Sequence, residues 1–569
     1  MGRLFSEHFK RRVSCLDGAW KNAVDNKNVG LAENWCCGLP KGKTVMVPSV
    51  WNTENDMLSY EGKVWYEKQF FTAEKCIRLV FEGVMTEATV WLDGKLLGTH
   101  YGGFSSFNFI VGEVASGVHK LVLCVDNSFN SKSIPQAWVD WYHYGGIVRS
   151  VYVEELKGIS ILNNRLDYEL NSELTAAKGA FTLELYNADN KSLKTTLTAK
   201  LDGIAVFEQN ISLEAGQRLN FKTDEFEIQN IRLWDIGSPE LYNIEFLTDT
   251  DDLLDRTGFR KVEVKNEGIY LNGKTVELRG VNRHEEYPDF GFAFPKNLMG
   301  KDLDIIEKLN CNSIRGSHYP NSKEFVDMMD ERGILFWSEI PIWGFGFSEE
   351  VLADPIVVER GLNMHREMIE QYFNHPCIII WGMHNEILSD TKPGYNMTKT
   401  FYEFLKENGG NRIITYATCR VSTDICLELC DVISINQYSG WYSNVSWQDY
   451  LNDVRKRREE LGLSDKPVIM GEFGCAALYG NHTFDNISWT EEYQAELLQN
   501  SINIFHQDPM VVGFYVWQYC DMRTCRRAGL DRARGFNNKG IVNEYRKPKA
   551  AYFAVQKAYK ALEREEKEC

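Results

Sequence analysis

The run CIIIWGMHNE, residues 377–386, decides how the second half of this sequence folds. Its first five residues are apolar, and it ends on the polar residues His384, Asn385 and Glu386. A short apolar run of this kind is typical of a strand buried in a parallel sheet. Seven similar runs occur after residue 264, namely TVELRGVN (275–282), CNSIRGS (311–317), GILFWSEI (333–340), RIITYATC (412–419), DVISINQY (431–438), KPVIMGEF (466–473) and VVGFYVWQ (511–518).

Amphipathic, helix-like stretches separate these runs. They include KDLDIIEKL (301–309), SKEFVDMMDER (322–332), VVERGLNMHREMIEQYF (357–373), QDYLNDVRKRREEL (448–461) and EEYQAELLQNSINIF (491–505). Alternation of strands and helices predicts a parallel α/β domain, and eight strands in order predict a (β/α)8 TIM barrel over residues 264–569. A doubly wound sheet is the alternative, but it has fewer strands and requires a Gly-rich phosphate turn after the first, which the sequence lacks.

The sequence before the barrel reads as two β-sandwich domains. Over residues 1–155, short alternating runs such as KVWYEKQFF (63–71) and HKLVLCVDN (119–127) are broken by turn residues, with Asp93-Gly94 as a hairpin signal. We expect an N-terminal jelly-roll sandwich there. Residues 156–263 hold about seven short strands in roughly 100 residues, which predicts an immunoglobulin-like sandwich.

Composition and charge exclude several classes of function. The net charge of −17 argues against a nucleic-acid partner, because phosphate binding needs a basic surface. No run of about 18 apolar residues is present, so we expect no membrane partner. The first twenty residues lack the apolar centre of a secretory signal, which favours a cytoplasmic protein. None of the 14 cysteines has zinc-site spacing, and we expect reduced thiols and no metal.

Chemistry in such barrels takes place at the carboxyl ends of the strands. Polar or aromatic residues stand there after seven of the eight runs, at Arg283, His284, Glu285, His318, Glu339, Asn385, Glu386, Tyr438, Tyr442, Glu472 and Trp517. Glu386 and Glu472, on strands 4 and 7, face each other across the barrel mouth. That placement can bring their carboxyl groups to about 5 Å, the spacing of a retaining glycosidase. Either residue alone would more often be part of a structural ion pair, but the two together favour catalysis.

The motifs of the chain resemble those of glycoside hydrolase family 2. DWYHYGGIVRSV (140–151) resembles the signature of its sugar-binding domain, and LWDIGSPELY (233–242) and GFRKVEV (258–264) resemble the end of its immunoglobulin-like domain. The barrel motifs are LRGVNRHE, IRGSHYP, WGMHNE and GEFG. The resemblance covers essentially the full length. It implies a hydrolase with Glu386 as acid/base and Glu472 as nucleophile.

Within the family, the chain resembles the β-glucuronidases. RGFNNKGIVNEYRKPKAAYF (534–553) is similar to their ending, in which an Asn-x-Lys pair, here Asn537 and Lys539, binds the substrate carboxylate. The resemblance further implies sugar contacts at Asp140, His318, Asn385 (to the 2-hydroxyl), Tyr438, Tyr442 and Trp517. The expected reaction is therefore hydrolysis of β-D-glucuronides. The alternatives are a β-galacturonidase or dual uronidase, a β-galactosidase, and a non-catalytic carbohydrate-binding protein.

Other implications of the resemblance are less specific. The segment after strand 3, residues 340–361, is short, whereas some bacterial members carry a long loop there that covers the site. The arginine expected before Asn-x-Lys has no clean match, and Arg532 and Arg534 bracket its position. No cofactor is required, although a few relatives bind flavin. A homo-oligomer, commonly a tetramer among relatives, is expected.

Overall fold

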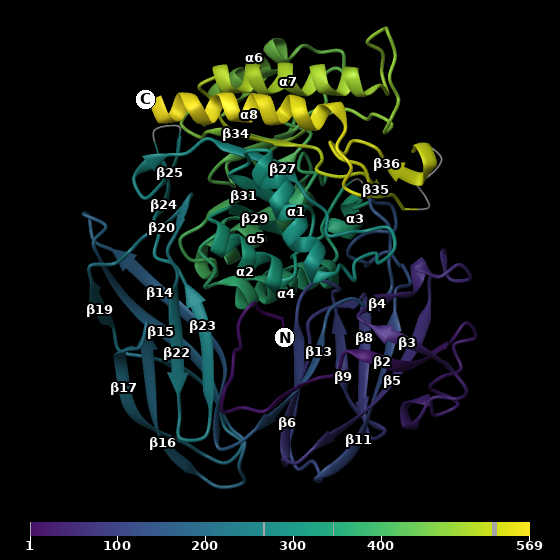
Figure 1. Ribbon diagram of the computed structural model, residues 1–569, viewed down its shortest axis with the longest axis vertical. Helices are drawn as coiled ribbons and strands as arrows, with labels where there is room; N and C mark the ends of the chain where they lie inside the picture. The colour runs from purple at the N-terminus through teal and green to yellow at the C-terminus, as the bar shows by residue number, and fades with distance from the viewer. Residues whose placement is uncertain (1, 266–267, 345, 526–531, 569) are drawn as a thin grey trace.

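The computed structural model describes residues 2–265, 268–344, 346–525 and 532–568, with side chains to residue 563. Figure 1 shows a helix-covered barrel above two β-sandwiches that lie side by side. The predicted combination of a jelly-roll-type sandwich, an immunoglobulin-like sandwich and a TIM barrel is confirmed.

The first sandwich packs a six-stranded sheet, β3-β2-β5-β11-β8-β9, against a four-stranded sheet, β1-β13-β6-β10, with the short sheet β4-β12-β7 beside them. Val64 and Tyr66 of β5 and Leu123 of β11 point into one apolar core, as strand alternation requires. Asp93 and Gly94 have φ of 50° and 80°, which confirms the hairpin turn between β8 and β9. The strands are β1 Val13–Cys15, β2 Gly18–Val24, β3 Lys43–Val47, β4 Ser49–Val50, β5 Lys63–Thr72, β6 Cys76–Phe81, β7 Val84–Met85, β8 Glu87–Leu92, β9 Lys95–Tyr101, β10 Phe107–Val111, β11 Gly117–Asp126, β12 Gly146–Ile147 and β13 Val151–Leu156.

The second sandwich consists of the sheets β14-β15-β18, with β19 also paired to β15, and β17-β16-β22-β23. Phe181 and Phe246, one from each sheet, meet edge to face at 4.9 Å in its core. The strands are β14 Ile159–Leu170, β15 Ala176–Asn187, β16 Leu193–Leu201, β17 Ile204–Leu213, β18 Arg218–Lys222, β19 Phe226–Gln229, β22 Tyr242–Leu247 and β23 Asp252–Thr257. Two small sheets, β20-β21 (Trp234–Asp235, Ser238–Pro239) and β24-β25-β26 (Val262–Lys265, Gly268–Leu271, Lys274–Thr275), lead to the barrel.

Eight parallel strands, β27 to β34, close the barrel, and each lies within one of the eight apolar runs. They are β27 Leu278–Asn282, β28 Ser313–Gly316, β29 Leu335–Glu339, β30 Ile378–Asn385, β31 Ile413–Thr418, β32 Ile433–Asn436, β33 Val468–Phe473 and β34 Val511–Val516. The helices are α1 Lys296–Lys308, α2 Lys323–Arg332, α3 Glu349–Leu352, α4 Pro355–Tyr372, α5 Lys392–Asn408, α6 Trp447–Glu460, α7 Glu491–Gln507 and α8 Ala550–Glu568. A two-stranded sheet of β35 Met522–Arg523 and β36 Phe536–Asn537 follows the last barrel strand.

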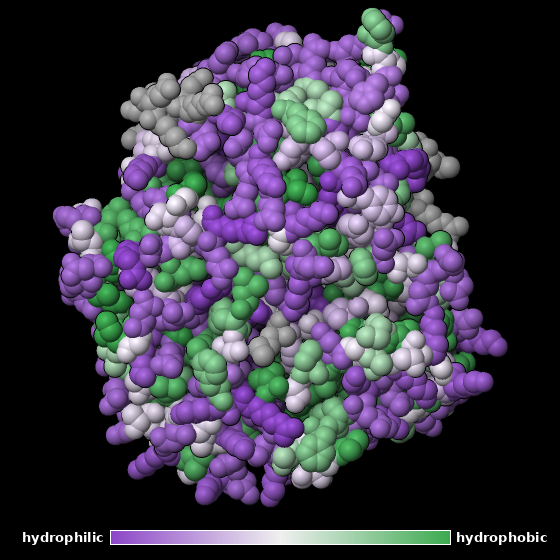
Figure 2. Space-filling model, viewed as in Figure 1, coloured by the Kyte–Doolittle hydropathy of each residue, from purple (hydrophilic) through white to green (hydrophobic). Residues whose placement is uncertain are grey.

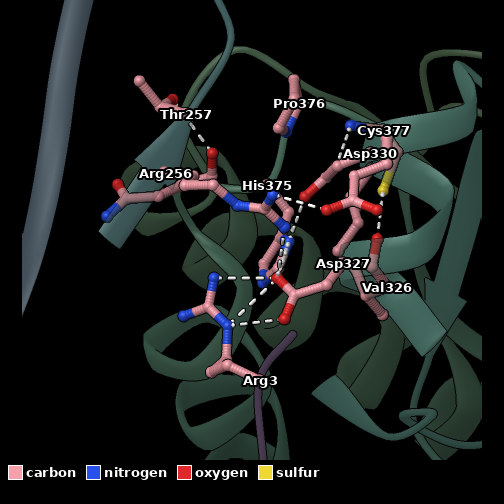
Figure 3. A network of polar contacts seen from close by, with 12 residues as sticks. Arg3, Arg256, Thr257, Val326, Asp327, Asp330, His375, Pro376 and Cys377 are labelled. Atoms are coloured by element: carbon pink, nitrogen blue, oxygen red, sulfur yellow. Dashed lines mark hydrogen bonds and ion pairs between the residues drawn. The ribbon is translucent and has the colours of Figure 1, made fainter. Parts of the chain in front are cut away.

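The N-terminal segment connects all three domains through buried charges. Figure 3 shows Arg3 reaching Asp327 of α2, where Arg3 Nε lies 2.9 Å from Asp327 Oδ2. Arg3 Nη2 also lies 3.0 Å from Asp255 of β23. Burial alone would raise the pKa of Asp327, but the charge of Arg3 outweighs it and holds that pKa below its usual value. Asp327, Asp330 and His375 lie close enough to share a cation, yet Arg3 already occupies both oxygens of Asp327.

The surface agrees with the composition. Figure 2 shows a mostly hydrophilic face on which apolar residues are scattered. Among the described residues, no helix has the length and apolar character needed to cross a membrane. The thirteen cysteines in the described ranges are all free thiols.

Candidate active site

Two glutamates stand at the carboxyl ends of barrel strands 4 and 7. Glu386 directly follows β30, and its φ of +53° is in the left-handed region, which side chains other than glycine rarely adopt. Its N–H donates to the carbonyl of Ala417 on β31 at 2.9 Å, which holds this turn in place. Glu472 lies in β33 and is 3% exposed. Backbone strain of this kind is common where a side chain must be presented for function.

Different partners hold the two carboxyl groups. Asn436 Nδ2 donates to Glu386 Oε1 at 2.8 Å. Glu472 Oε1 accepts from Arg315 Nη1 at 2.8 Å, and Glu472 Oε2 accepts from the hydroxyl of Tyr438 at 2.7 Å. Glu472 therefore has a cation and a phenol to stabilise its ionised form, whereas Glu386 has one neutral donor among the residues that the structure describes.

The pKa values follow from these surroundings. Burial, together with the negative charge of Glu472, raises the pKa of Glu386 to about 8. Burial also raises the pKa of Glu472, but only to about 7, because Arg315 and Tyr438 favour the ionised form and oppose the rise. The pair therefore loses its first proton from Glu472 and keeps the second on Glu386. An ionised carboxylate beside a protonated one is the arrangement that attack and proton donation together require.

This order predicts the pH dependence of activity. If Glu472 attacks the sugar and Glu386 donates the proton, kcat/KM should be highest between about pH 7 and pH 8, where Glu472 is deprotonated and Glu386 is protonated. Tyr438→Phe removes the hydroxyl that stabilises ionised Glu472, so the acidic limb should move to higher pH. Activity below pH 7 should fall by roughly 10- to 100-fold, the usual strength of a hydrogen bond to a charged group. An acidic limb that does not move would contradict the proposed role of Tyr438 in stabilising ionised Glu472.

Arg315 is the central residue that the sequence analysis did not select as a site residue. It is fully buried in β28, and besides Glu472 it contacts both oxygens of Glu339, at 3.1 and 3.0 Å, and Asn385 Oδ1, at 2.7 Å. An arginine inside an apolar barrel strand, in IRGS, was the available signal, because a buried guanidinium requires anionic partners. Asn436, the partner of Glu386, was missed in the same way.

His318, Asn385 and Trp517 lie around this network. The His318 ring stacks on Trp517 with centroids 5.2 Å apart, and its Nδ1 is 2.6 Å from Glu339 Oε1. Burial and the charge of Arg315 hold the pKa of His318 well below its usual value, so the ring is neutral. Among the described residues, His318 Nε2 and Asn385 Nδ2 are buried without a hydrogen-bond partner. His318 Nε2 lies 3.8 Å from Glu472 Oε1, and two unpaired polar atoms of this kind are suited to bind sugar hydroxyls.

The remaining predicted residues form a second cluster, which joins the first domain to the barrel. Lys539 is 1% exposed, and its Nζ lies 2.7 Å from the hydroxyl of Tyr442. Asn537 Nδ2 donates to Asp140 Oδ2 at 2.9 Å, so Asp140 of the sandwich reaches the barrel. Tyr442 is 62% exposed, which leaves most of its ring open to solvent. Partial burial would raise the pKa of Tyr442, but the charges of Lys539 and Arg532 outweigh it and lower that pKa.

The two arginines that bracket the expected position lie apart. Arg532 Nη2 contacts both oxygens of Asp140, at 2.6 and 2.7 Å, and its Nη1 lies 3.2 Å from the Tyr442 hydroxyl. Arg534 instead pairs with Glu544 at 2.9 Å. Arg532 therefore belongs to the cluster around Lys539, and Arg534 is held by a partner outside it.

Three family models together match almost the whole chain. They are the TIM barrel domain of glycosyl hydrolases family 2 at residues 262–564, the sugar binding domain of that family at 13–156, and the family's remaining model at 159–260.

Solved structures agree with these matches. The chain resembles a β-galacturonidase from Eisenbergiella tayi bound to galacturonate, with 34% identity, a TM-score of 0.92 and 99% of each chain covered. It also resembles a β-glucuronidase from Ruminococcus gnavus in complex with D-glucaro-δ-lactam, with 27% identity, a TM-score of 0.87 and coverage of 98% and 99%. A β-galactosidase from Thermoanaerobacterium thermosulfurigenes is 31% identical over 85% of this chain, which spans 66% of that relative. The predicted resemblance is confirmed, and the chain belongs to glycosyl hydrolases family 2 and is a glycosidase.

Proposed function

We propose that the protein is a retaining exo-β-glucuronidase. In the first step, Glu472 attacks the anomeric carbon while Glu386 gives its proton to the leaving oxygen, which forms a covalent glycosyl-enzyme and frees the aglycone. In the second step, Glu386 takes a proton from water, the water attacks the same carbon, and Glu472 leaves. The reaction releases glucuronate of unchanged anomeric configuration and requires neither a metal nor a cofactor.

The buried ammonium of Lys539 carries the proposal for a sugar acid. Its polar side-chain partner is the hydroxyl of Tyr442, and it has no carboxylate partner among the residues that the structure describes. A buried cation without an anion is costly, and a substrate carboxylate would supply the missing charge. Arg532 adds a second cation beside Tyr442, and Asn537 adds a neutral donor. Relatives that act on galacturonides and glucuronides support the same class of substrate.

A β-galacturonidase, or a dual uronidase, is the second candidate. The structural relative with 34% identity binds galacturonate, and the two sugar acids share the carboxylate and differ at C4. A β-galactosidase acts on a sugar whose C6 group is neutral, and such a substrate would leave Lys539 without an anionic partner. A non-catalytic binding protein would not need two glutamates with pKa values near neutrality. Initial rates on 4-nitrophenyl glucuronide, galacturonide and galactoside separate these candidates.

Removal of the proposed carboxylate cation tests the substrate class. A cation held against a carboxylate in a partly dry site contributes about 2 to 4 kcal/mol, by analogy with truncated buried charge pairs. Lys539→Ala should therefore lower kcat/KM on a glucuronide by roughly 30- to 1000-fold. Trace activity on the matching glucoside, whose C6 is neutral, should change little. Asn537→Ala should show the same selectivity with a smaller loss.

Lys406→Ala is the matched control, because Lys406 pairs with Asp431 on the outside of the barrel. It should leave the ratio of glucuronide to glucoside activity unchanged. If Lys539→Ala lowers both activities equally, the lysine is structural and the uronidase proposal fails. We further propose that the enzyme is a homo-oligomer in the cytoplasm. Its domains are proposed to divide at residues 155/156 and 263/264.

A further inference from the structure

Three buried polar side chains contact the segment that carries Lys539, and two of them also contact the loop that follows Glu472. We call them the clamp, and they are Gln494, Asp521 and Lys549. Gln494 belongs to α7, and Lys549 directly precedes α8, which lies beside α7 at the top of the barrel in Figure 1. All three side chains are at most 1% exposed, and the mechanism proposed above uses none of them.

Lys549 joins two loops through its ammonium group. Its Nζ donates to Asp521 Oδ1 at 2.8 Å, to the carbonyl of Ala477 at 2.7 Å and to the carbonyl of Asn538 at 3.0 Å. An ammonium group has three protons, so its donor capacity is fully used. Ala477 lies five residues after Glu472, and Asn538 directly precedes Lys539. One buried cation therefore links the loop of one reacting group to the segment of the proposed carboxylate-binding group.

Gln494 and Asp521 repeat the same connection. Gln494 Nε2 donates to the carbonyls of Cys475, at 2.8 Å, and Lys539, at 3.2 Å. Asp521 Oδ1 also accepts the N–H of Gly540 at 2.9 Å. Each member of the clamp therefore fixes backbone atoms of the 537–540 segment, and two of the three also fix the loop that follows β33.

We propose that the clamp sets the separation between Glu472 and Lys539, and so positions the proposed carboxylate-binding group relative to the reacting carbon. This inference rests on the proposed uronidase function. In a pyranose ring the anomeric carbon and the C6 carboxylate are a fixed distance apart, so both contacts form only if the protein keeps a matching spacing. A misplacement of about 1 Å can cost roughly 100-fold in rate. Gln494, Asp521 and Lys549 are positioning residues, because they act on Lys539 through the backbone of residues 538–540.

The energetics of the clamp agree with a positioning role. Replacing a buried ion pair by apolar side chains of similar volume is often neutral or favourable for stability. Asp521 and Lys549 are completely buried, so a contribution to stability alone does not account for charged groups at these positions. A requirement to hold two carbonyls at defined points does account for them, because an apolar side chain cannot donate hydrogen bonds.

A double-mutant cycle between Lys549 and Lys539 tests the proposal. Lys549→Met should lower kcat/KM on 4-nitrophenyl β-D-glucuronide by roughly 10- to 100-fold, while trace glucosidase activity changes less than about threefold. In a Lys539→Ala background, the same substitution should cost less than about threefold on the glucuronide, because the group that it positions is already absent. Val555→Ala is the control, because it changes a buried residue of α8 outside the clamp. It should leave the ratio of glucuronide to glucoside activity unchanged, both alone and in the Lys539→Ala background.

Each outcome distinguishes the two proposals. The positioning role of the clamp would be refuted if the losses in kcat/KM were additive in the cycle. It would also be refuted if Lys549→Met lowered activity on the glucuronide and the glucoside equally. If Lys539→Ala itself leaves the substrate ratio unchanged, the uronidase proposal fails instead. Should Lys549→Met not fold, as judged by thermal unfolding, Gln494→Leu removes the carbonyl contacts without unpairing a buried charge. It should show the same non-additivity with a smaller loss, and additivity there would equally refute the clamp.

Discussion

Glu472→Ala should abolish turnover on every substrate, with kcat falling by roughly 10⁴- to 10⁶-fold, the scale seen when a hydrolase loses its nucleophile. The loss follows from the structure, because Glu472 is the carboxylate that Arg315 and Tyr438 keep ionised. Azide should restore part of the activity by attacking the anomeric carbon from the vacated side. The product would be the glycosyl azide of inverted configuration, which NMR identifies.

Glu428→Ala is the matched control for this substitution, because Glu428 is exposed on the outer face of the barrel and contacts Tyr395. It should retain the parent rate. More than about 1% residual activity in Glu472→Ala without azide would show that another group attacks the sugar, and would transfer the assignment away from Glu472.

The fold could be predicted from sequence because each level of organisation leaves its own pattern. Barrel strands are buried on both faces, so they appear as short apolar runs such as residues 377–381, and their number and order indicate a closed barrel. The helix α5 was harder to identify, because Lys392-Pro393-Gly394 at its start resembles a loop. The side chain of Thr391 caps this helix, and proline is tolerated in its first turn.

The site could be predicted only in part, because residues that act through tertiary contacts leave weak local signals. Glu386 and Glu472 were selected as candidates because they stand at strand ends and match family motifs. Arg315 lies within a strand rather than at its end, and it precedes its partner Glu472 by 157 positions, so its place in the local sequence does not mark it as a site residue. Sequence order also left Arg532 and Arg534 equivalent. Their different partners, Asp140 for the first and Glu544 for the second, exist only in the folded chain.

Glu386→Gln should have an effect that depends on the leaving group. A general acid contributes roughly 10²- to 10⁴-fold when the departing oxygen is basic. The variant's kcat/KM on an alkyl or phenyl glucuronide should therefore fall by about that much. Its kcat/KM on a dinitrophenyl glucuronide should fall little, because dinitrophenolate departs without a proton. The amide is similar in size to the carboxyl group and keeps an oxygen for Asn436, so the change is chemical rather than structural. The alkaline limb of the pH profile, which reflects the pKa of Glu386 near 8, should flatten.

The same variant also distinguishes the roles of the two glutamates through azide. Without Glu386 as a base, water attacks the glycosyl-enzyme slowly, so with a good leaving group the covalent intermediate should accumulate. Azide needs no base and should release this intermediate as the azide of retained configuration, because Glu472 has already inverted the centre once. Glu472→Ala should give the opposite anomer, since azide then makes the only displacement. If both variants gave the same anomer, or if Glu386→Gln slowed all leaving groups equally, the assignment of acid and nucleophile would be wrong.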